Sequence, residues 1–252
     1  MAGSPEQVAE GVYRVADGVV NWYAVTDEAD GLAIVDAGWP RSLGAITAAL
    51  GQLGRSPSDV DAILLTHGHP DHVGAAEHLR RESGAPVLAA RDEAERVRGK
   101  APGSSPFRLV PGLTTQLWRP TAAKFIGEAT VKGFLMPTWV EEVEPFDVGD
   151  VLDVPGKPTV IATPGHTPGH VSFAFGERGV LISGDAIATR DPVTGATGPR
   201  LLHDVVNEDS ARARESLAAV GGVEADLLLA GHGEPWRGAM SDAAAQAQER
   251  AS

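Results

Sequence analysis

Four side chains that commonly bind metal ions fall within the segment THGHPDH: His67, His69, Asp71 and His72. Imidazole nitrogens and carboxylate oxygens suit zinc, and they also bind iron, manganese or cobalt. In an extended segment, residues two apart point the same way, so His67 and His69 can close on one ion. Asp71 and His72, displaced along the chain, can reach a second ion. A solvated polar turn is the alternative, and it explains so dense a group of ligand-type residues poorly.

The local sequence predicts a strand, a sharp turn and a helix around these residues. The segment from Asp61 to Thr66 is apolar on both faces, as in a buried strand, and Gly68 and Pro70 prevent its continuation. Apolar residues then recur at helical spacing from Val73 to Leu79, which predicts a helix that begins near Asp71. The four side chains would therefore lie between the end of a strand and the start of a helix.

Three later segments carry residues of the same kinds: ATPGHTPGH with His166, LISGDA with Asp185 and LLAGHGEP with His232. A carboxylate at the end of a strand can face a cleft, and its two oxygens can bridge cations about 3.5–4 Å apart. Taken alone, Asp185 would be interpreted as a turn or capping residue. We expect His170 to support the metal ligands or to have a structural role rather than to bind metal, and His203 to be an exposed loop residue.

The segment THGHPDH matches the HxHxDH motif of the metallo-β-lactamase superfamily, and the chain resembles that family from VDAG at Val35 to His232. The resemblance implies an α/β (α+β) fold, the four-layer αββα sandwich with two mixed sheets and helices outside. It also implies that Asp36 supports the metal loops; a simple turn residue is the alternative. The implied ligands are His67, His69 and His166 for one metal, Asp71, His72 and His232 for the other, and Asp185 as a bridge.

This ligand set favours hydrolysis. Two divalent ions that share a water lower its pKa to about 7, so a bridging hydroxide is available at neutral pH without a serine or cysteine nucleophile. Asp71 is the expected catalytic side chain, because it can orient the hydroxide or take up its proton. The family favours two Zn²⁺ ions, and iron or manganese would suit the same ligands.

Differences from known subgroups of this family narrow the range of expected substrates. The resemblance to class B β-lactamases is weaker, because the chain has no cysteine and carries a bridging carboxylate at Asp185. Little sequence follows His232, so the C-terminal glutathione-binding domain of glyoxalase II is not expected. The residues after Asp185, AIATRD, lack the tyrosine of acyl-homoserine-lactone lactonases. We expect a dinuclear hydrolase of an ester, lactone or thioester. The alternatives are a mononuclear iron persulfide dioxygenase, a β-lactamase, a phosphodiesterase or a non-catalytic metal-binding module.

The composition limits partners and location. The chain has 34 acidic and 21 basic residues and a net charge of -13, which disfavours phosphate backbones and therefore a nucleic-acid partner. It has no cysteine for disulfides, no apolar run of membrane-spanning length, and no signal peptide in MAGSPEQVAEGVYRV. We expect a soluble cytoplasmic enzyme that acts on a small molecule.

The remaining pattern predicts one domain over residues 1–252, with an insertion at about 99–145. Strands are expected at 12–15, 20–25, 32–35, 86–90, 151–154, 159–162, 171–175, 180–182 and 226–230, and helices at 42–53, 91–98, 210–220 and 240–250. The insertion carries many apolar and aromatic residues without a clean period. It could be a lid or substrate wall, or it could pack its own aromatics and form a homodimer contact. Trp39 could line the pocket or pack within its loop.

Overall fold

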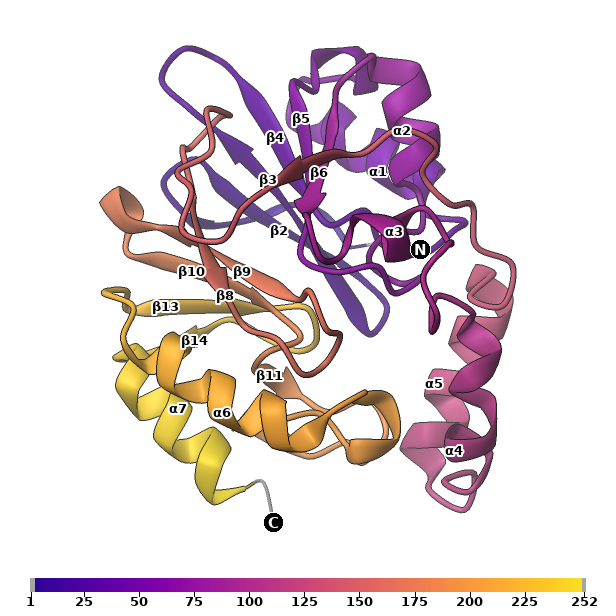
Figure 1. Ribbon diagram of the computed structural model, residues 1–252. Helices are drawn as coiled ribbons and strands as arrows, with labels where there is room; N and C mark the ends of the chain where they lie inside the picture. Colours follow the sequence, from indigo (N-terminus) through magenta and orange to yellow (C-terminus); the bar gives the residue numbers. More distant parts are fainter. Residues whose placement is uncertain (1–2, 251–252) are drawn as a thin grey trace.

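Two sheets lie face to face in the computed structural model, which describes residues 3–250 (Figure 1). The strands of the first sheet, in spatial order, are β1 (Glu6–Ala9), β2 (Val12–Asp17), β3 (Val20–Thr26), β4 (Leu32–Val35), β5 (Ala62–Leu65), β6 (Val87–Ala90) and β7 (Glu144–Phe146). The strands of the second, in spatial order, are β14 (Trp236–Arg237), β13 (Leu227–Ala230), β10 (Val180–Gly184), β9 (Val171–Phe175) and β8 (Thr159–Ala162). Both sheets mix parallel and antiparallel pairs, as the sequence predicts.

Helices cover the outer face of each sheet. The helices beside the first sheet are α1 (Leu43–Gln52), α2 (Ala76–Ser83) and α3 (Ala94–Val97), and those beside the second are α6 (Ser210–Gly221) and α7 (Met240–Glu249) (Figure 1). Two further helices, α4 (Val110–Thr114) and α5 (Pro120–Lys132), lie to one side with the small hairpin of β11 (Ala188–Arg190) and β12 (Thr197–Arg200). Short 3-10 turns occur at η1 (Pro57–Asp59), η2 (Pro106–Arg108), η3 (Gly176–Arg178) and η4 (Asp204–Val206). The four-layer αββα sandwich is confirmed.

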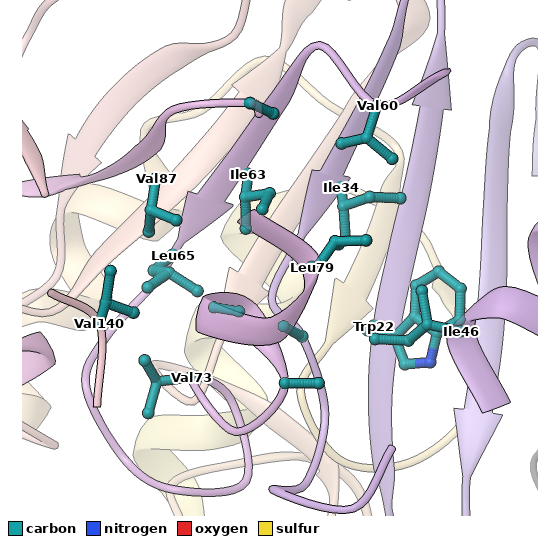
Figure 2. Close-up of a cluster of buried hydrophobic side chains, with 14 of the residues drawn as sticks. Trp22, Ile34, Ile46, Val60, Ile63, Leu65, Val73, Leu79, Val87 and Val140 are labelled. Carbon is teal, nitrogen blue, oxygen red and sulfur yellow. The ribbon is translucent and has the colours of Figure 1, made fainter. Parts of the chain in front are cut away.

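Strand alternation divides the apolar side chains of the first sheet between two cores. Ile34 and Ile63 face outward, where Ile46 of α1 and Leu79 of α2 cover them (Figure 2). Their neighbours along the strands, such as Leu64, face inward and pack against the second sheet. Complete burial of one such side chain stabilises the fold by about 1.5–3 kcal/mol. A third core, formed by residues of β10, β13, α6 and α7, lies under the last two helices.

Parallel pairing brings four strand ends to one edge of the sandwich. In the first sheet β4 and β5 run parallel, and in the second β10 and β13 run parallel. The segments that follow β4 and β5 begin at Asp36 and Thr66, and those that follow β10 and β13 begin at Asp185 and Gly231. Because the carboxyl ends of parallel strands meet at one edge, residues far apart in the sequence converge there.

The helix expected from Asp71 begins later, at Ala76. The intervening residues form turns because neighbouring backbone groups bind their N–H groups. Gly74 N–H donates to the carbonyl of Gly38 at 3.0 Å, and Ala75 N–H to that of Ala37 at 3.2 Å. A Cβ at Gly74 would lie 2.1 Å from backbone atoms of the 38–40 loop, so this close approach requires glycine.

Other expected elements also differ from the structure. The strand expected at 151–154 is wrong, because a single bridge, Val151 with Thr159, forms there. The helix expected at 91–98 is shorter, since only Ala94–Val97 is helical. The sequence patterns did not predict β1, β7, β14 or the β11–β12 hairpin, which are short strands of two to four residues with little alternation of their own.

The 99–145 segment packs on the body of the protein through aromatic contacts. Trp39 is fully buried, and its ring centroid lies 6.4 Å from that of Phe125 and 6.2 Å from that of Phe134. Its Nε1 donates to the Asp17 carbonyl at 3.0 Å, and the Asp17 carboxylate accepts from Lys132 at the end of α5. Trp39 is therefore a packed loop aromatic, one of the two interpretations expected: it is buried against the 99–145 segment and does not line the pocket described below.

Candidate metal centre

The seven side chains expected from the sequence to bind metal come together at the shared edge of the two sheets. Three overlapping groups have potential ligand atoms within 4.8 Å of one another: His67, His69 and His166; His67, His72 and Asp185; and Asp71, His72 and His232. All of these side chains are buried. The first sheet supplies the 67–72 turn, and the second supplies the loops after β8, β10 and β13.

Three imidazoles form one half of the cluster. His69 Nδ1 lies 3.2 Å from His67 Nε2 and 2.8 Å from His166 Nε2. Two nitrogens bound to one tetrahedral zinc at about 2.0–2.1 Å are themselves about 3.3 Å apart. One spacing is close to that value and the other is shorter, so the three nitrogens are near enough to share a single ion. We call them the three-histidine group.

Asp185 lies between that group and the remaining ligands. Its Oδ2 is 3.2 Å from His166 Nε2 and 3.3 Å from His232 Nε2, and its Oδ1 is 3.5 Å from His72 Nε2. Asp71 Oδ2 completes the second half, 3.7 Å from His232 Nε2. We call Asp71, His72 and His232 the mixed group. One carboxylate thus contacts both halves of the cluster.

Acceptors outside the cluster bind the outer nitrogens of the mixed-group histidines. His72 Nδ1 lies 2.8 Å from Asp36 Oδ2, and His232 Nδ1 lies 2.7 Å from the Val19 carbonyl oxygen. A carboxylate and a carbonyl can only accept, so each Nδ1 carries a proton and each Nε2 points inward, where its lone pair is available to a metal ion once the ring is neutral. Both Nε2 atoms face the Asp185 carboxylate.

The three-histidine group is held in the same way. His166 Nδ1 lies 2.9 Å from Asn207 Oδ1, whose amide nitrogen donates elsewhere, to the Leu202 carbonyl. His166 Nε2 therefore faces inward as a lone pair. His67 Nδ1 lies 3.0 Å from Thr66 Oγ1. Outer-shell hydrogen bonds of this kind are typical of histidines that bind metal.

Two buried polar atoms at the centre lack hydrogen-bond partners, and they indicate that the residues suit a cation. His72 Nε2 and Asp185 Oδ1 have no partner among residues 3–250. An unpaired buried polar group costs free energy. A divalent cation would satisfy both atoms at once, so the donor set fits one or more metal ions.

Burial and charged neighbours shift the pKa values of the clustered side chains. Burial lowers the pKa of His67 well below its usual value, and the neighbouring imidazoles lower it further. Burial also disfavours the charged form of His72, but Asp185 and Asp36 outweigh it and raise the pKa of His72 well above its usual value. Burial raises the pKa of Asp185, while His232 and His72 outweigh that effect and hold it well below the usual range. Asp185 is therefore an ionised carboxylate.

Asp36 and His170, the two residues expected to support the metal ligands, both form hydrogen bonds to ligand residues. Asp36 accepts from the backbone N–H of Thr66 at 2.9 Å, from the Thr66 hydroxyl, and from His72. His170 Nε2 accepts from the backbone N–H of Asp185 at 3.0 Å, and its Nδ1 contacts the Thr163 hydroxyl. Burial lowers the pKa of His170 to about 3, so this imidazole remains a neutral acceptor.

The expectation for His203 was wrong, and two residues that contact the ligand loops, Asn207 and Glu93, were not predicted from the sequence. His203 is half-buried rather than exposed, and its Nδ1 accepts from the Val205 N–H at the start of η4. Asn207, which binds His166, has no motif that marks it. Glu93 contacts two ligand loops, yet in the sequence it lies in the charged run RDEAER and resembles a surface helix residue.

A pocket of about 170 Å³ lies directly beside His69. The insertion and the segment around η4 form its other walls, with Ser104, Arg108, Leu109 and Val205 among the lining residues. A larger hollow of about 480 Å³ lies behind the 164–171 loop, and none of the seven clustered side chains lines it. Of these two hollows, the smaller one is therefore placed for chemistry at the cluster.

Known proteins are similar to this chain in sequence and in fold. The family model described as the metallo-beta-lactamase superfamily matches residues 15–232. The probable metallo-hydrolase YflN of Bacillus subtilis (strain 168) is 31% identical over 247 residues, covering 94% of this chain and 89% of YflN. The hydroxyacylglutathione hydrolase GloC of Haemophilus influenzae is 26% identical over 168 residues, covering 66% of this chain and 66% of GloC. Among solved structures, a B3 metallo-β-lactamase with an active-site glutamic acid aligns with a TM-score of 0.67 and 24% identity, covering 99% of this chain and 87% of that chain.

The chain therefore belongs to the metallo-β-lactamase superfamily, which confirms the resemblance drawn from THGHPDH and the later motifs. It is a metal-dependent hydrolase. Among its described residues, no helix has the length and apolar character needed to cross a membrane.

Proposed function

We propose that the protein is a dinuclear metal-dependent hydrolase of an ester, lactone or thioester. One observation carries this proposal: the Asp185 carboxylate lies within 3.5 Å of imidazole nitrogens from both halves of the cluster. The three-histidine group would hold one ion, the mixed group the other, and Asp185 both. The imidazole and carboxylate ligands suit zinc first, with iron or manganese as alternatives.

A bound metal pair supplies Lewis acidity and lowers the pKa of water toward neutrality. The protein side chains then have three tasks. The imidazoles hold their inner lone pairs in place through fixed outer hydrogen bonds, as at His72 and His232. Asp71, with an oxygen 3.7 Å from His232 Nε2, would orient the attacking water and take up its proton. The surrounding apolar core excludes other water.

The pocket beside His69 supports a substrate with an apolar acyl part. Leu109 and Val205 provide apolar walls, and Arg108 lies at the same pocket with its side chain more than half exposed. The insertion thus contributes one wall of the proposed substrate site. The similarity to GloC, a hydroxyacylglutathione hydrolase, is an additional reason to include thioesters. We further propose that residues 1–252 act as one catalytic unit on a small molecule, since the net charge of -13 disfavours nucleic acid.

A substrate screen with metal-quantified protein tests the proposal. We expect two divalent ions per chain and hydrolysis of some lactones, esters or thioesters, with little activity on β-lactams or phosphodiesters. One iron per chain with oxygenation of a persulfide would instead support the persulfide dioxygenase alternative.

His69→Ala tests the site itself. We expect loss of hydrolysis by about 100-fold or more and a fall in bound metal, because a ligand of the three-histidine group is removed. His203→Ala, which changes a half-buried histidine outside the cluster, is the matched control and should retain both activity and metal. Full activity in His69→Ala would contradict the proposed role of the cluster.

A further inference from the structure

One buried carboxylate connects two loops that carry the three-histidine group. Glu93 lies between β6 and α3 and is only 1% exposed. Its Oε1 accepts from the backbone N–H of Gly68 at 3.0 Å, and its Oε2 accepts from that of Gly169, also at 3.0 Å. Gly68 lies between His67 and His69, and Gly169 lies three residues after His166. The two loops come from different sheets, so this side chain spans the seam between them.

A buried arginine continues this connection to the segment after η4. Arg96, 3% exposed, lies with its Nε 3.1 Å from Glu93 Oε1 and its Nη2 2.9 Å from Glu208 Oε1. The backbone N–H of Glu208 in turn donates to the His166 carbonyl at 3.2 Å. A buried carboxylate needs this pairing, because its charge would otherwise be poorly compensated. Glu93, Arg96 and Glu208 thus form a chain of contacts between the two loops that carry the three-histidine group.

Close packing leaves these contacts little freedom. A Cβ at Gly68 would lie 2.7 Å from Arg96 Cγ, and a Cβ at Gly169 would lie 2.6 Å from the Glu93 backbone nitrogen. Neither position accommodates a side chain without displacement of the loop. The separation of the two loops is therefore set by their contact with Glu93 and Arg96.

We propose that Glu93 is a positioning residue that sets the spacing of the three-histidine group and hence its affinity for metal, separately from the mixed group. The mixed group is supported by Asp36 and the Val19 carbonyl, and the hydrogen bonds of Glu93 go to neither of them. The inference rests on the metal binding in the proposed function, but it does not depend on the substrate.

The test is Zn²⁺ titration of the metal-free protein against a competing chelator. In Glu93→Gln, one of the two accepting oxygens becomes an NH₂ group that faces a backbone N–H, so one loop loses its anchor. The effect of Glu93→Gln on Zn²⁺ affinity is measured in two variant proteins, His72→Ala and His69→Ala. His72→Ala leaves the three-histidine group intact, and there Glu93→Gln should weaken Zn²⁺ binding by about 10- to 100-fold. His69→Ala disrupts that group, and there the same change should alter Zn²⁺ affinity by less than about threefold.

Two further variants guard against a general loss of structure. Glu95→Gln changes an exposed glutamate on α3, the short helix that follows Glu93, and should leave the Zn²⁺ affinity in both backgrounds unchanged. Gly169→Ala keeps the carboxylate but forces the loop away, so it should reproduce the selective loss. The melting temperature of each metal-free variant shows whether the fold is retained.

The outcomes separate this inference from the proposed function. Equal losses in both backgrounds, or no loss in the His72→Ala background, would overturn the positioning role while leaving hydrolysis untouched. A protein that binds Zn²⁺ but hydrolyses no ester, lactone or thioester would contradict the proposed function, and the selective effect of Glu93→Gln would still be observed.

Discussion

Asp36 shows how a single residue orients a metal ligand from outside the cluster. Its φ is +58°, in the left-handed region that few residues other than glycine, asparagine and aspartate adopt readily. This conformation lets one carboxylate accept from both Thr66 and His72. The resemblance implied such support, and the hydrogen bonds give it a physical basis: the ring of His72 is fixed with its Nε2 directed at Asp185.

Asp36→Asn tests that role at the residue scale. Asparagine tolerates the same φ, so the backbone should persist, but its amide can no longer serve as a charged acceptor toward both partners. We expect Zn²⁺ affinity of the mixed group to fall by about 10- to 100-fold, as measured by titration in the His69→Ala background. Asp30→Asn is the control, because Asp30 also has a positive φ, of +69°, but lies in an exposed turn. Similar losses in both variants would contradict the assignment.

Helix α2 illustrates how charge fixes an element beside the site. The Glu77 carboxylate, 1% exposed, accepts from Arg80 and Arg81 on its own helix and from the backbone N–H of Glu141. It thereby ties α2 to the chain that leads into β7. Burial alone would raise the pKa of Glu77, but the hydrogen bonds from Arg80 and the Glu141 backbone outweigh it and lower the pKa to about 2.

Glu77→Gln should reduce the free energy of unfolding by about 2 kcal/mol near neutral pH, because charged hydrogen bonds are lost from a buried position. The folded-state pKa lies below the usual value of about 4.5, so the native state favours the ionised form. The contribution is therefore fully present above about pH 4.5 and is lost as pH falls toward about 2. Urea unfolding of the metal-free protein at several pH values measures it. Glu82→Gln, an exposed change on the same helix, is the control.

If the free energy of unfolding differed between wild type and Glu77→Gln by the same amount at pH 7 and at pH 3, this account of α2 would be contradicted. A loss in Glu82→Gln as large as that in Glu77→Gln would contradict it too, since it would point to helix propensity rather than to the buried ion pairs.

At the scale of the whole molecule, the cluster lies where the two sheets meet. The 67–72 turn belongs to the first sheet, whereas His166, Asp185 and His232 follow strands of the second. Metal ions bound here would join the two halves of the sandwich noncovalently. Ions held by residues of both sheets would stabilise the folded state, so metal binding and fold stability should be coupled.

Removal of metal with a chelator should therefore lower the melting temperature. Saturation at about 1,000 times the dissociation constant stabilises by about 4 kcal/mol per site, which corresponds to about 10 °C for a chain of this size. Differential scanning calorimetry with and without Zn²⁺ measures the shift. The His69→Ala protein should show a smaller shift than wild type, and an unchanged melting temperature on chelation of wild type would contradict the coupling.

Local sequence determined the parts of this protein that short-range physics controls. The apolar run at 62–65 forms a buried strand because both of its faces are covered, and the residue types at His67, His69 and His72 define metal-type chemistry without any structure. The helices at 43–52 and 210–221 follow from apolar spacing. The family resemblance supplied the layer order, which the structure confirms.

Only the tertiary structure decided which distant residues meet. Glu93 and Asn207 carry no local signal, because their partners are backbone and side-chain groups of loops more than 20 residues away. The start of α2 at Ala76 was likewise decided by carbonyls of residues 37–38, which bind N–H groups that an isolated helix would use itself. Hydrogen bonds across the seam between sheets depend on how the sheets pack, and periodicity along the chain does not encode that packing.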